Sequence, residues 1–258
     1  MIQVIDPFQV YLVALIFART SAILVTAPLF RGRNVPSMVK AGFALLVALL
    51  LLPTVAPPAD LPVTIWGLAG LLACEVLIGV SMGFLVQLFF WAVGVAGQLI
   101  DTEMGFHMAN VLDPLSDSQF PLIGNLFSML CILLYLSLHG HLLLLRALAE
   151  SFQIMPLGRF NFPSNVTLLI NACTRLLALA VQIALPVIGA SLFTSLMFGI
   201  MAKSVPQMNV FIVGMPLKIV LLSIVIVITL PGLVSFMERG LGDVFLQVAD
   251  WLASGGSP

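Results

Sequence analysis

Four ionisable side chains in or beside the longest apolar stretch of the chain could carry protons. Glu75 is the single charge between residues 63 and 100, and Asp101, Glu103 and His107 follow closely. An ionisable residue at membrane depth is a functional candidate by default, so these side chains could form a relay in a secondary transporter or proton-coupled channel. Asp101 and Glu103 make a poor acid-base dyad, because helix positions two apart point about 200° away from each other.

Metal and enzyme chemistry have weaker support. The run His139-Gly140-His141, even with His107 and Glu103, does not supply the converging ligands of a first-row metal site. Gly140 instead favours a helix end at Leu138 or His139. The chain contains no nucleophile elbow, phosphate-binding glycine loop or zinc-protease motif, so we predict no enzyme, no metal site and no cofactor.

The three cysteines lie far apart in apolar stretches, where a free cysteine behaves as a small hydrophobic residue. They predict no disulfide framework and no zinc site. They are Cys74, Cys131 and Cys173.

A continuous helix from residue 75 to 105 would place its small and polar residues in one stripe. At about 100° of rotation per residue they fall within a sector of about 140°. The stripe consists of Glu75, Gly79, Gly83, Gln87, Gly94, Gly97, Gln98, Asp101 and Gly105. Small residues let helices approach closely and polar ones bond across them, so the stripe predicts a helix-packing face. A polar lining for a conduit is the alternative interpretation.

The segment from Gly105 to Pro121 follows that helix. It mixes Phe and Met with turn formers, and Asp113-Pro114 is a strong break. Thioether and aromatic side chains fill irregular space, so this composition suits a loop that packs inside something. A simple connector is the alternative.

The elements that position these residues belong to a membrane protein. Of the 258 residues, 61% are apolar and 8% are charged, against roughly 45 to 50% and 25% in a soluble domain. This composition excludes disorder and requires lipid or partner subunits to cover the apolar surface. The net charge of −1 provides no basic field for nucleic acid.

Charge-poor windows predict about six apolar helices, many of them badly matched to a membrane span of about 20 residues. The stretch between Pro36 and Pro53 is too short for a span, and that from Val63 to Ile100 is too long. Kinks or breaks are expected at Pro186, Pro206, Pro216 and Pro231. We therefore expect broken helices that pack largely on other subunits.

The last part of the chain predicts an amphipathic helix that docks at an interface. From Leu233 onward, one helical arc is apolar and the opposite arc is polar or charged. The apolar arc consists of Phe236, Met237, Leu241, Val244, Phe245, Val248 and Leu252.

Short motifs spread over nearly the whole chain carry a family resemblance by their order and spacing. They include Phe17-Ala18-Arg19, Val35-Pro36, Ala96-Gly97-Gln98-Leu99-Ile100-Asp101, Met104-Gly105, Asp113-Pro114, Glu150-Ser151-Phe152, Pro156-Leu157-Gly158, Ala184-Leu185-Pro186-Val187 and Gly214-Met215-Pro216-Leu217. With them the chain resembles the FliR family, the flagellar type III export-gate subunits whose virulence counterpart is SctT. The family-motif positions are Arg19, Pro36, Pro186, Lys203, Pro206, Gln207, Asn209, Gly214 and Pro216. Lys203 stands where many members have arginine.

The resemblance implies an all-α, multi-pass subunit of the bacterial inner membrane and the flagellar basal body. It implies assembly with FliP and FliQ homologues, next to an FlhB homologue, into a conduit for unfolded export substrates. Residues 1–258 would form a single subunit. Its part from about 1 to 165 would be FliP-like, and its part from about 166 to 258 would be a FliQ-like helical hairpin with the C-terminal amphipathic helix.

The resemblance also assigns residues 105–121 to a pore plug. A flexible apolar plug would hold back ions, because ions lose hydration in a dry constriction. On this hypothesis Asp113 and Pro114 fix the bend of the loop. The sealing side chains would be Phe106, Met108, Val111, Leu112 and Phe120.

Two other functions compete with the export gate. A secondary transporter or proton-coupled channel would use Glu75, Asp101 and Glu103, although the chain is small and has no visible inverted repeat. The other competing function is a structural scaffold in which the loop of residues 105–121 does not move.

Overall fold

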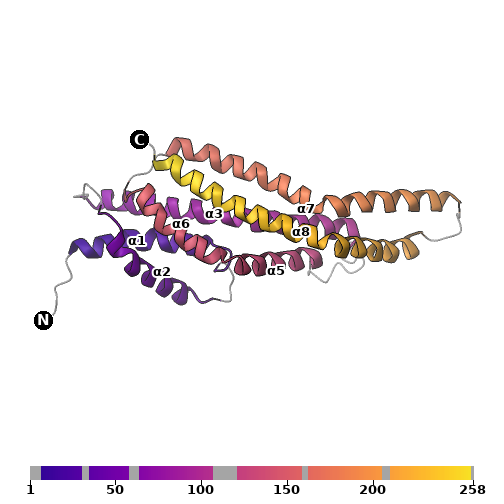
Figure 1. The fold of residues 1–258 in the computed structure, drawn as a ribbon, viewed down its shortest axis with the longest axis horizontal. Helices are drawn as coiled ribbons and strands as arrows, with labels where there is room; N and C mark the ends of the chain where they lie inside the picture. The colour runs from indigo at the N-terminus through magenta and orange to yellow at the C-terminus, as the bar shows by residue number, and fades with distance from the viewer. Residues whose placement is uncertain are drawn as a thin grey trace. The chain divides into compact units, whose positions relative to one another are not determined.

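The computed structural model describes residues 7–30, 35–57, 64–106, 121–158, 162–204 and 210–256. Within these ranges the chain forms seven α-helices and a short 3-10 helix, and no strand, which confirms the all-α prediction (Figure 1). The helices are α1 (Pro7–Thr26), α2 (Ser37–Leu51), α3 (Ile65–Met104), α5 (Leu122–Ser137), α6 (Gly140–Ile154), α7 (Phe162–Ser204) and α8 (Val210–Gly256), with η1 (Leu52–Thr54) after α2.

Five helical stretches in the described part are long and apolar enough to cross a membrane. They are Phe8–Thr26, Ser37–Thr54, Ile65–Met104, Ile170–Ser204 and Val213–Ser254. The pair α5 and α6, bent by 64° at its break, would add a sixth. The helices are uneven in length as expected: α2 has 15 residues and α3 has 40. With η1, however, the stretch that contains α2 reaches 18 residues, Ser37–Thr54, so the prediction that it is too short to span a membrane is wrong. At about 1.5 Å per residue these helices measure about 22 and 60 Å, against a hydrocarbon core of about 30 Å.

Three prolines that predicted kinks or breaks do not end a helix. Pro186 lies inside α7, and Pro216 and Pro231 lie inside α8. The breaks expected at these three prolines are therefore absent, whereas a kink at each of them is compatible with a continuous helix. A proline removes one helical hydrogen bond, whereas in apolar surroundings the other backbone groups have no better partner than their own helix. Pro206 lies outside the described residues.

The corner between α5 and α6 lies near the predicted helix end, but different residues form it. α5 ends at Ser137, and His139 adopts a left-handed conformation with φ of 55°. Gly140, which was expected to end a helix, begins α6 instead. A Cβ atom at this position would overlap the ring of Tyr135, so the glycine is required by packing.

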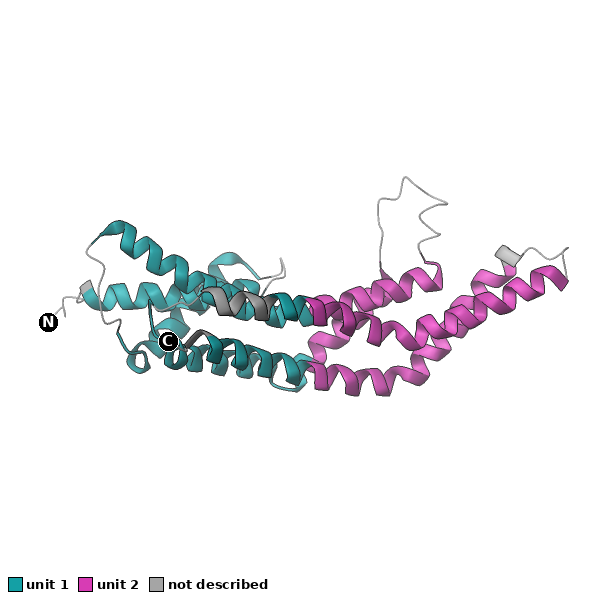
Figure 2. Cartoon of the chain, turned by 90° about the horizontal axis from the view of Figure 1, so that it is seen from above, with its two compact units in different colours: residues 1–89, 135–173, 241–258 teal, residues 90–134, 174–240 magenta. Residues whose placement is uncertain are grey.

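The described chain forms two compact units (Figure 2). Unit 1 contains residues 1–89, 135–173 and 241–258, and unit 2 contains residues 90–134 and 174–240. In unit 1, α1 packs against α2, and the rings of Phe30 and Phe43 stack with their centroids 5.7 Å apart. The predicted amphipathic arc is the last part of α8, where Leu241, Val244 and Val248 are buried.

Candidate functional site

A buried ion pair joins α1 to α3 in unit 1. Arg19 and Glu75 are both 0% exposed, and Nε of Arg19 lies 2.6 Å from Oε2 of Glu75. An isolated buried charge would be strongly disfavoured, so each side chain requires the other at this depth. Glu75 is thus bonded directly to a cation on a neighbouring helix.

The remaining donors of Arg19 fix the end of α6. Nη1 donates to Oγ of Ser151 at 3.1 Å, and Nη2 donates to the Met155 carbonyl at 3.1 Å. The guanidinium also lies 4.3 Å from the ring centroid of Phe152, a favourable cation-π geometry. A cation at a helix C-terminus further complements the negative end of the helix dipole. One arginine therefore holds α1, α3 and α6 together.

The second oxygen of Glu75 binds the turn that follows α6. The backbone N–H of Gly158 donates to Oε1 at 3.0 Å. Gly158 has φ of 82°, which side chains other than glycine rarely adopt. Both carboxylate oxygens of Glu75 therefore have hydrogen-bond partners. The network is suited to holding helices in register, and its members are Arg19, Glu75, Ser151, Met155 and Gly158.

The stripe of α3 faces α1 in this unit. A Cβ atom on Gly79 would overlap the Arg19 carbonyl and the side chain of Ala22, and one on Gly83 would overlap the side chain of Thr26. The two helices therefore touch directly along the stripe. Gln87 is buried too, and its Oε1 atom has no hydrogen-bond partner among the described residues.

In unit 2 the stripe packs against α5. The two acids near the end of α3, Asp101 and Glu103, have partners other than Arg19. Asp101 is 0% exposed and accepts the backbone N–H groups of Ile123 and Gly124 at 2.9 and 3.0 Å. Glu103 lies two residues after Asp101 and outside the stripe. Its carboxylate accepts a hydrogen bond from the Ser191 hydroxyl, and its Oε2 atom lies 4.0 Å from Nζ of Lys218. Each of the three carboxylates proposed for a relay thus has partners of its own.

The remaining predicted positions are spread over both units. Gly97 is buried, Gly94 is partly buried and Gln98 is exposed. Among the family-motif positions, Pro186 and Lys203 lie in α7, Gly214 and Pro216 lie in α8, and Pro36 precedes α2. Pro206, Gln207 and Asn209 lie outside the described residues.

The predicted plug is described only at its two ends. Gly105 directly follows the last residue of α3 and has φ of 85°, and Phe106 is partly buried. Pro121 precedes α5. Met108, Val111, Leu112, Asp113, Pro114 and Phe120 lie outside the described residues, as does His107.

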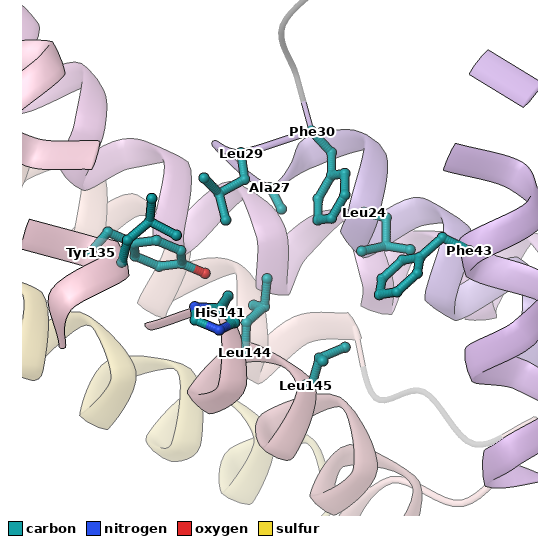
Figure 3. Close-up of a pocket in the computed structure, with 10 residues that line it drawn as sticks. Leu24, Ala27, Leu29, Phe30, Phe43, Tyr135, His141, Leu144 and Leu145 are labelled. Carbon is teal, nitrogen blue, oxygen red and sulfur yellow. The ribbon is translucent and has the colours of Figure 1, made fainter. Parts of the chain in front are cut away.

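An apolar pocket opens in unit 1 between α1, α2 and the corner of α5 and α6 (Figure 3). Its volume is about 180 Å³. Phe43 lies at one end and Tyr135 at the other, with the His141 ring below (Figure 3). Nδ1 of His141 is buried and has no hydrogen-bond partner among the described residues. Such a lining suits apolar groups better than an ion or a polar cofactor.

The described residues contain no cluster of three or more potential metal ligands, and Cys74, Cys131 and Cys173 are free thiols. The sequence motifs had included Ser151, Phe152 and Gly158 without indicating their contact with Arg19. The signal that could have found this site is charge complementarity, because an arginine and a glutamate in separate apolar helices tend to pair with one another.

The family of this chain follows from comparison with known proteins. Residues 10–244 match the family described as bacterial export proteins, family 1. The flagellar biosynthetic protein FliR of Bacillus subtilis strain 168 is 36% identical over 231 residues, which cover 88% of each chain. FliR of Escherichia coli K12 is 32% identical over 233 residues, covering 90% of this chain and 89% of the relative. The secretion system apparatus protein SsaT of Salmonella typhimurium is 34% identical over 188 residues, 72% of each chain. The chain belongs to the FliR family of bacterial export proteins.

Proposed function

We propose that this chain is a noncatalytic subunit of the flagellar type III protein export gate in the bacterial inner membrane. It assembles with FliP and FliQ homologues, beside an FlhB homologue, into a conduit for unfolded export substrates. The names of the relatives, flagellar biosynthetic protein and secretion system apparatus protein, support this assignment.

The observation that carries the proposal is the apolar surface of α7 and α8. In the apolar 18-residue windows of α7 and α8, 28% and 17% of the residues are buried in the chain itself. The helical stretches that contain these windows, Ile170–Ser204 and Val213–Ser254, have 35 and 42 residues, whereas about 20 residues cross a bilayer. Lipid alone is too thin to cover them, so other subunits must contribute.

The two-part organisation remains a proposal within the same function. After residue 161 the described chain consists of the two long helices α7 and α8. This arrangement supports a FliQ-like hairpin from about residue 166, whose second helix ends in the amphipathic arc. The part from residue 1 to about 165 would be FliP-like.

Residues 105–121 are the proposed plug of the conduit. We expect that deleting Met108 to Ser118 raises ion leakage through the assembled gate, because water and ions then enter a constriction that apolar side chains keep dry. The measurement is ion flux in membrane vesicles that contain the complex, with native mass spectrometry to verify that the same subunits are present.

The flux experiment also separates the alternatives. Unchanged leakage from a correctly assembled deletion variant would contradict the plug and favour the static scaffold. Ion-coupled transport by the chain alone, purified without other subunits, would contradict the gate and favour the transporter. The contacts of Glu75, Asp101 and Glu103 argue against the transporter, because each carboxylate already has bonding partners.

A further inference from the structure

A single carboxylate joins the end of α3 to the start of α5 in unit 2. Oδ1 of Asp101 accepts the N–H of Ile123, and Oδ2 accepts the N–H of Gly124. These amides belong to the first turn of α5, where backbone N–H groups have no partner within the helix. The residue before α5 is Pro121, which has no side-chain acceptor for a cap. Asp101 therefore caps α5 from a different helix.

The charge of Asp101 is suited to α5 and not to its own helix. It lies in the last turn of α3, where a carboxylate meets the negative end of the helix dipole. At the first turn of α5 the same carboxylate meets a positive helix end and two amide donors. The contact between α3 and α5 therefore explains why an acid occupies position 101.

Two glycines bring the backbones of these helices into direct contact one turn earlier. A Cβ atom on Gly97 would overlap the Cα and N atoms of Gly124. Because Gly97 precedes Asp101 by four residues, both lie on the same side of α3. The contact between glycines sets the separation at which the Asp101 carboxylate reaches the amides.

The backbone of Asp101 also closes α3. The Phe106 N–H donates to the Asp101 carbonyl at 3.2 Å, and the Gly105 N–H donates to the Thr102 carbonyl at 3.1 Å. With Gly105 in the left-handed region, these bonds form a Schellman ending. The chain therefore leaves α3 and enters α5 beside the same residue.

We propose that Asp101 is a positioning residue that locks together the two ends of the segment between Phe106 and Pro121. Asp101, Gly97 and Gly124 form the clamp between α3 and α5. The helix ends stay together because the carboxylate binds two amides at once. The consequence for export rests on the proposed function, since the clamp then determines where the plug is attached.

The first test measures the separation of the helix ends in the assembled complex. Spin labels are attached to cysteines at Thr102 and Leu126, which are both exposed, after Cys74, Cys131 and Cys173 are changed to alanine. Asp101→Asn preserves the shape but sets an amide against one backbone N–H. We expect a longer and broader distance distribution in this variant. An unchanged distribution would overturn the proposal.

Glu103→Gln is the matched control. It makes the same change from acid to amide at the same end of α3, but Glu103 contacts Ser191 and Lys218 and makes no contact with α5 in the bonds described above. The clamp predicts an unchanged label distance in Glu103→Gln. Equal widening in both variants would overturn the proposal, because a general loss of charge would then explain the effect.

A second measurement needs no variant of Asp101. Residue-resolved hydrogen exchange in the wild-type complex should show the Ile123 and Gly124 amides protected, although they lie in the first turn of a helix. Exchange as fast as at an uncapped helix start would overturn the clamp even if Asp101→Asn fails to assemble.

Ion flux separates this proposal from the function on which it rests. With the clamp and the plug both correct, Asp101→Asn raises leakage to a level between those of the wild type and the Met108 to Ser118 deletion. A widened label distance with no leakage in either variant would contradict the plug and leave the clamp in place. An unchanged distance contradicts the clamp whatever the flux.

Discussion

Arg19 and Glu75 show how a charge is tolerated inside an apolar chain. Neither has exposed surface, and their contacts extend over α1, α3 and α6 within unit 1. A buried pair of this kind offers little net stabilisation over apolar residues of the same size, but removing one member leaves an uncompensated charge. The effect of the pair here is to fix the register of three helices, α1, α3 and α6.

This asymmetry leads to a prediction with three variants. Arg19→Leu alone should lower the free energy of unfolding by about 3 to 5 kcal/mol, because Glu75 is left buried without its cation. The double variant Arg19→Leu, Glu75→Leu should lose less than the single variant. Chemical unfolding of the purified complex, followed by its helical signal, measures both.

The matched control is the exposed ion pair between Arg146 and Glu150. Its atoms are 2.8 Å apart and its side chains are 76% and 48% exposed. Arg146→Ala should therefore change the free energy of unfolding by about 1 kcal/mol or less. A double variant less stable than Arg19→Leu, or a control as damaging as Arg19→Leu, would contradict the role assigned to the buried pair.

Both members of this pair could be recognised in the sequence, but their contact could not. Arg19 stands out as the charge that interrupts the first apolar segment, and Glu75 as the one acid of the longest. They are 56 positions apart, and nothing local to either indicates the other. Only the packing of α1 against α3 brings the two side chains into contact.

At the scale of helices, direct backbone contact between α1 and α3 gives the next prediction. Gly79→Ala places a methyl group against the Arg19 carbonyl and Ala22, so it should destabilise the protein by about 1 to 3 kcal/mol. Gly70 lies on the same helix with nothing within 4 Å of a Cβ position. Gly70→Ala should therefore stabilise α3 by about 0.5 to 1 kcal/mol.

Thermal unfolding of the two variants side by side measures this difference. The pair separates packing from helix propensity, because both changes add the same methyl group to the same helix. Equal effects of Gly79→Ala and Gly70→Ala would show that α1 does not lie against the stripe of α3.

The helices could be located from the sequence better than their ends. Apolar windows identified the helical segments, and Pro36 and Pro53 correctly bounded the short α2. Pro186, Pro216 and Pro231 do not break their helices, because a proline costs one hydrogen bond and a continuous helix preserves all the others. The continuity of α3 that the stripe required is present as far as Met104, and only its last member, Gly105, lies beyond the helix end. The opposing glycine of α5, Gly124, could not be inferred from any periodic pattern.

At the scale of the whole molecule, the length of the helices limits what lipid can cover. The apolar window of α7, Ile170–Ser204, has 35 residues, or about 52 Å at 1.5 Å per residue. Even a tilt of about 40° leaves it spanning about 40 Å, more than the hydrocarbon core of about 30 Å. Exposed side chains occur along much of this window. They include Leu177, Val181, Leu185, Leu192, Leu196 and Ile200.

Truncating this surface distinguishes a protein cover from a lipid cover. Lipid refills the space left by a smaller side chain, whereas a packed subunit leaves a cavity and loses about 1.5 to 3 kcal/mol of burial per side chain. We therefore expect at least one of the double variants Leu177→Ala, Val181→Ala and Leu196→Ala, Ile200→Ala to lower the recovery of other subunits. Native mass spectrometry of the complex, purified through a tag on this chain, measures that recovery.

A volume-conserving change provides the control. Leu196→Met, Ile200→Met preserves apolar area and approximate size, so it should leave subunit recovery close to that of the wild type. If neither alanine pair lowers recovery, lipid covers α7 at both positions. The excess length of its apolar window must then be covered elsewhere along the helix, and the next pair to truncate is Leu185 with Leu192.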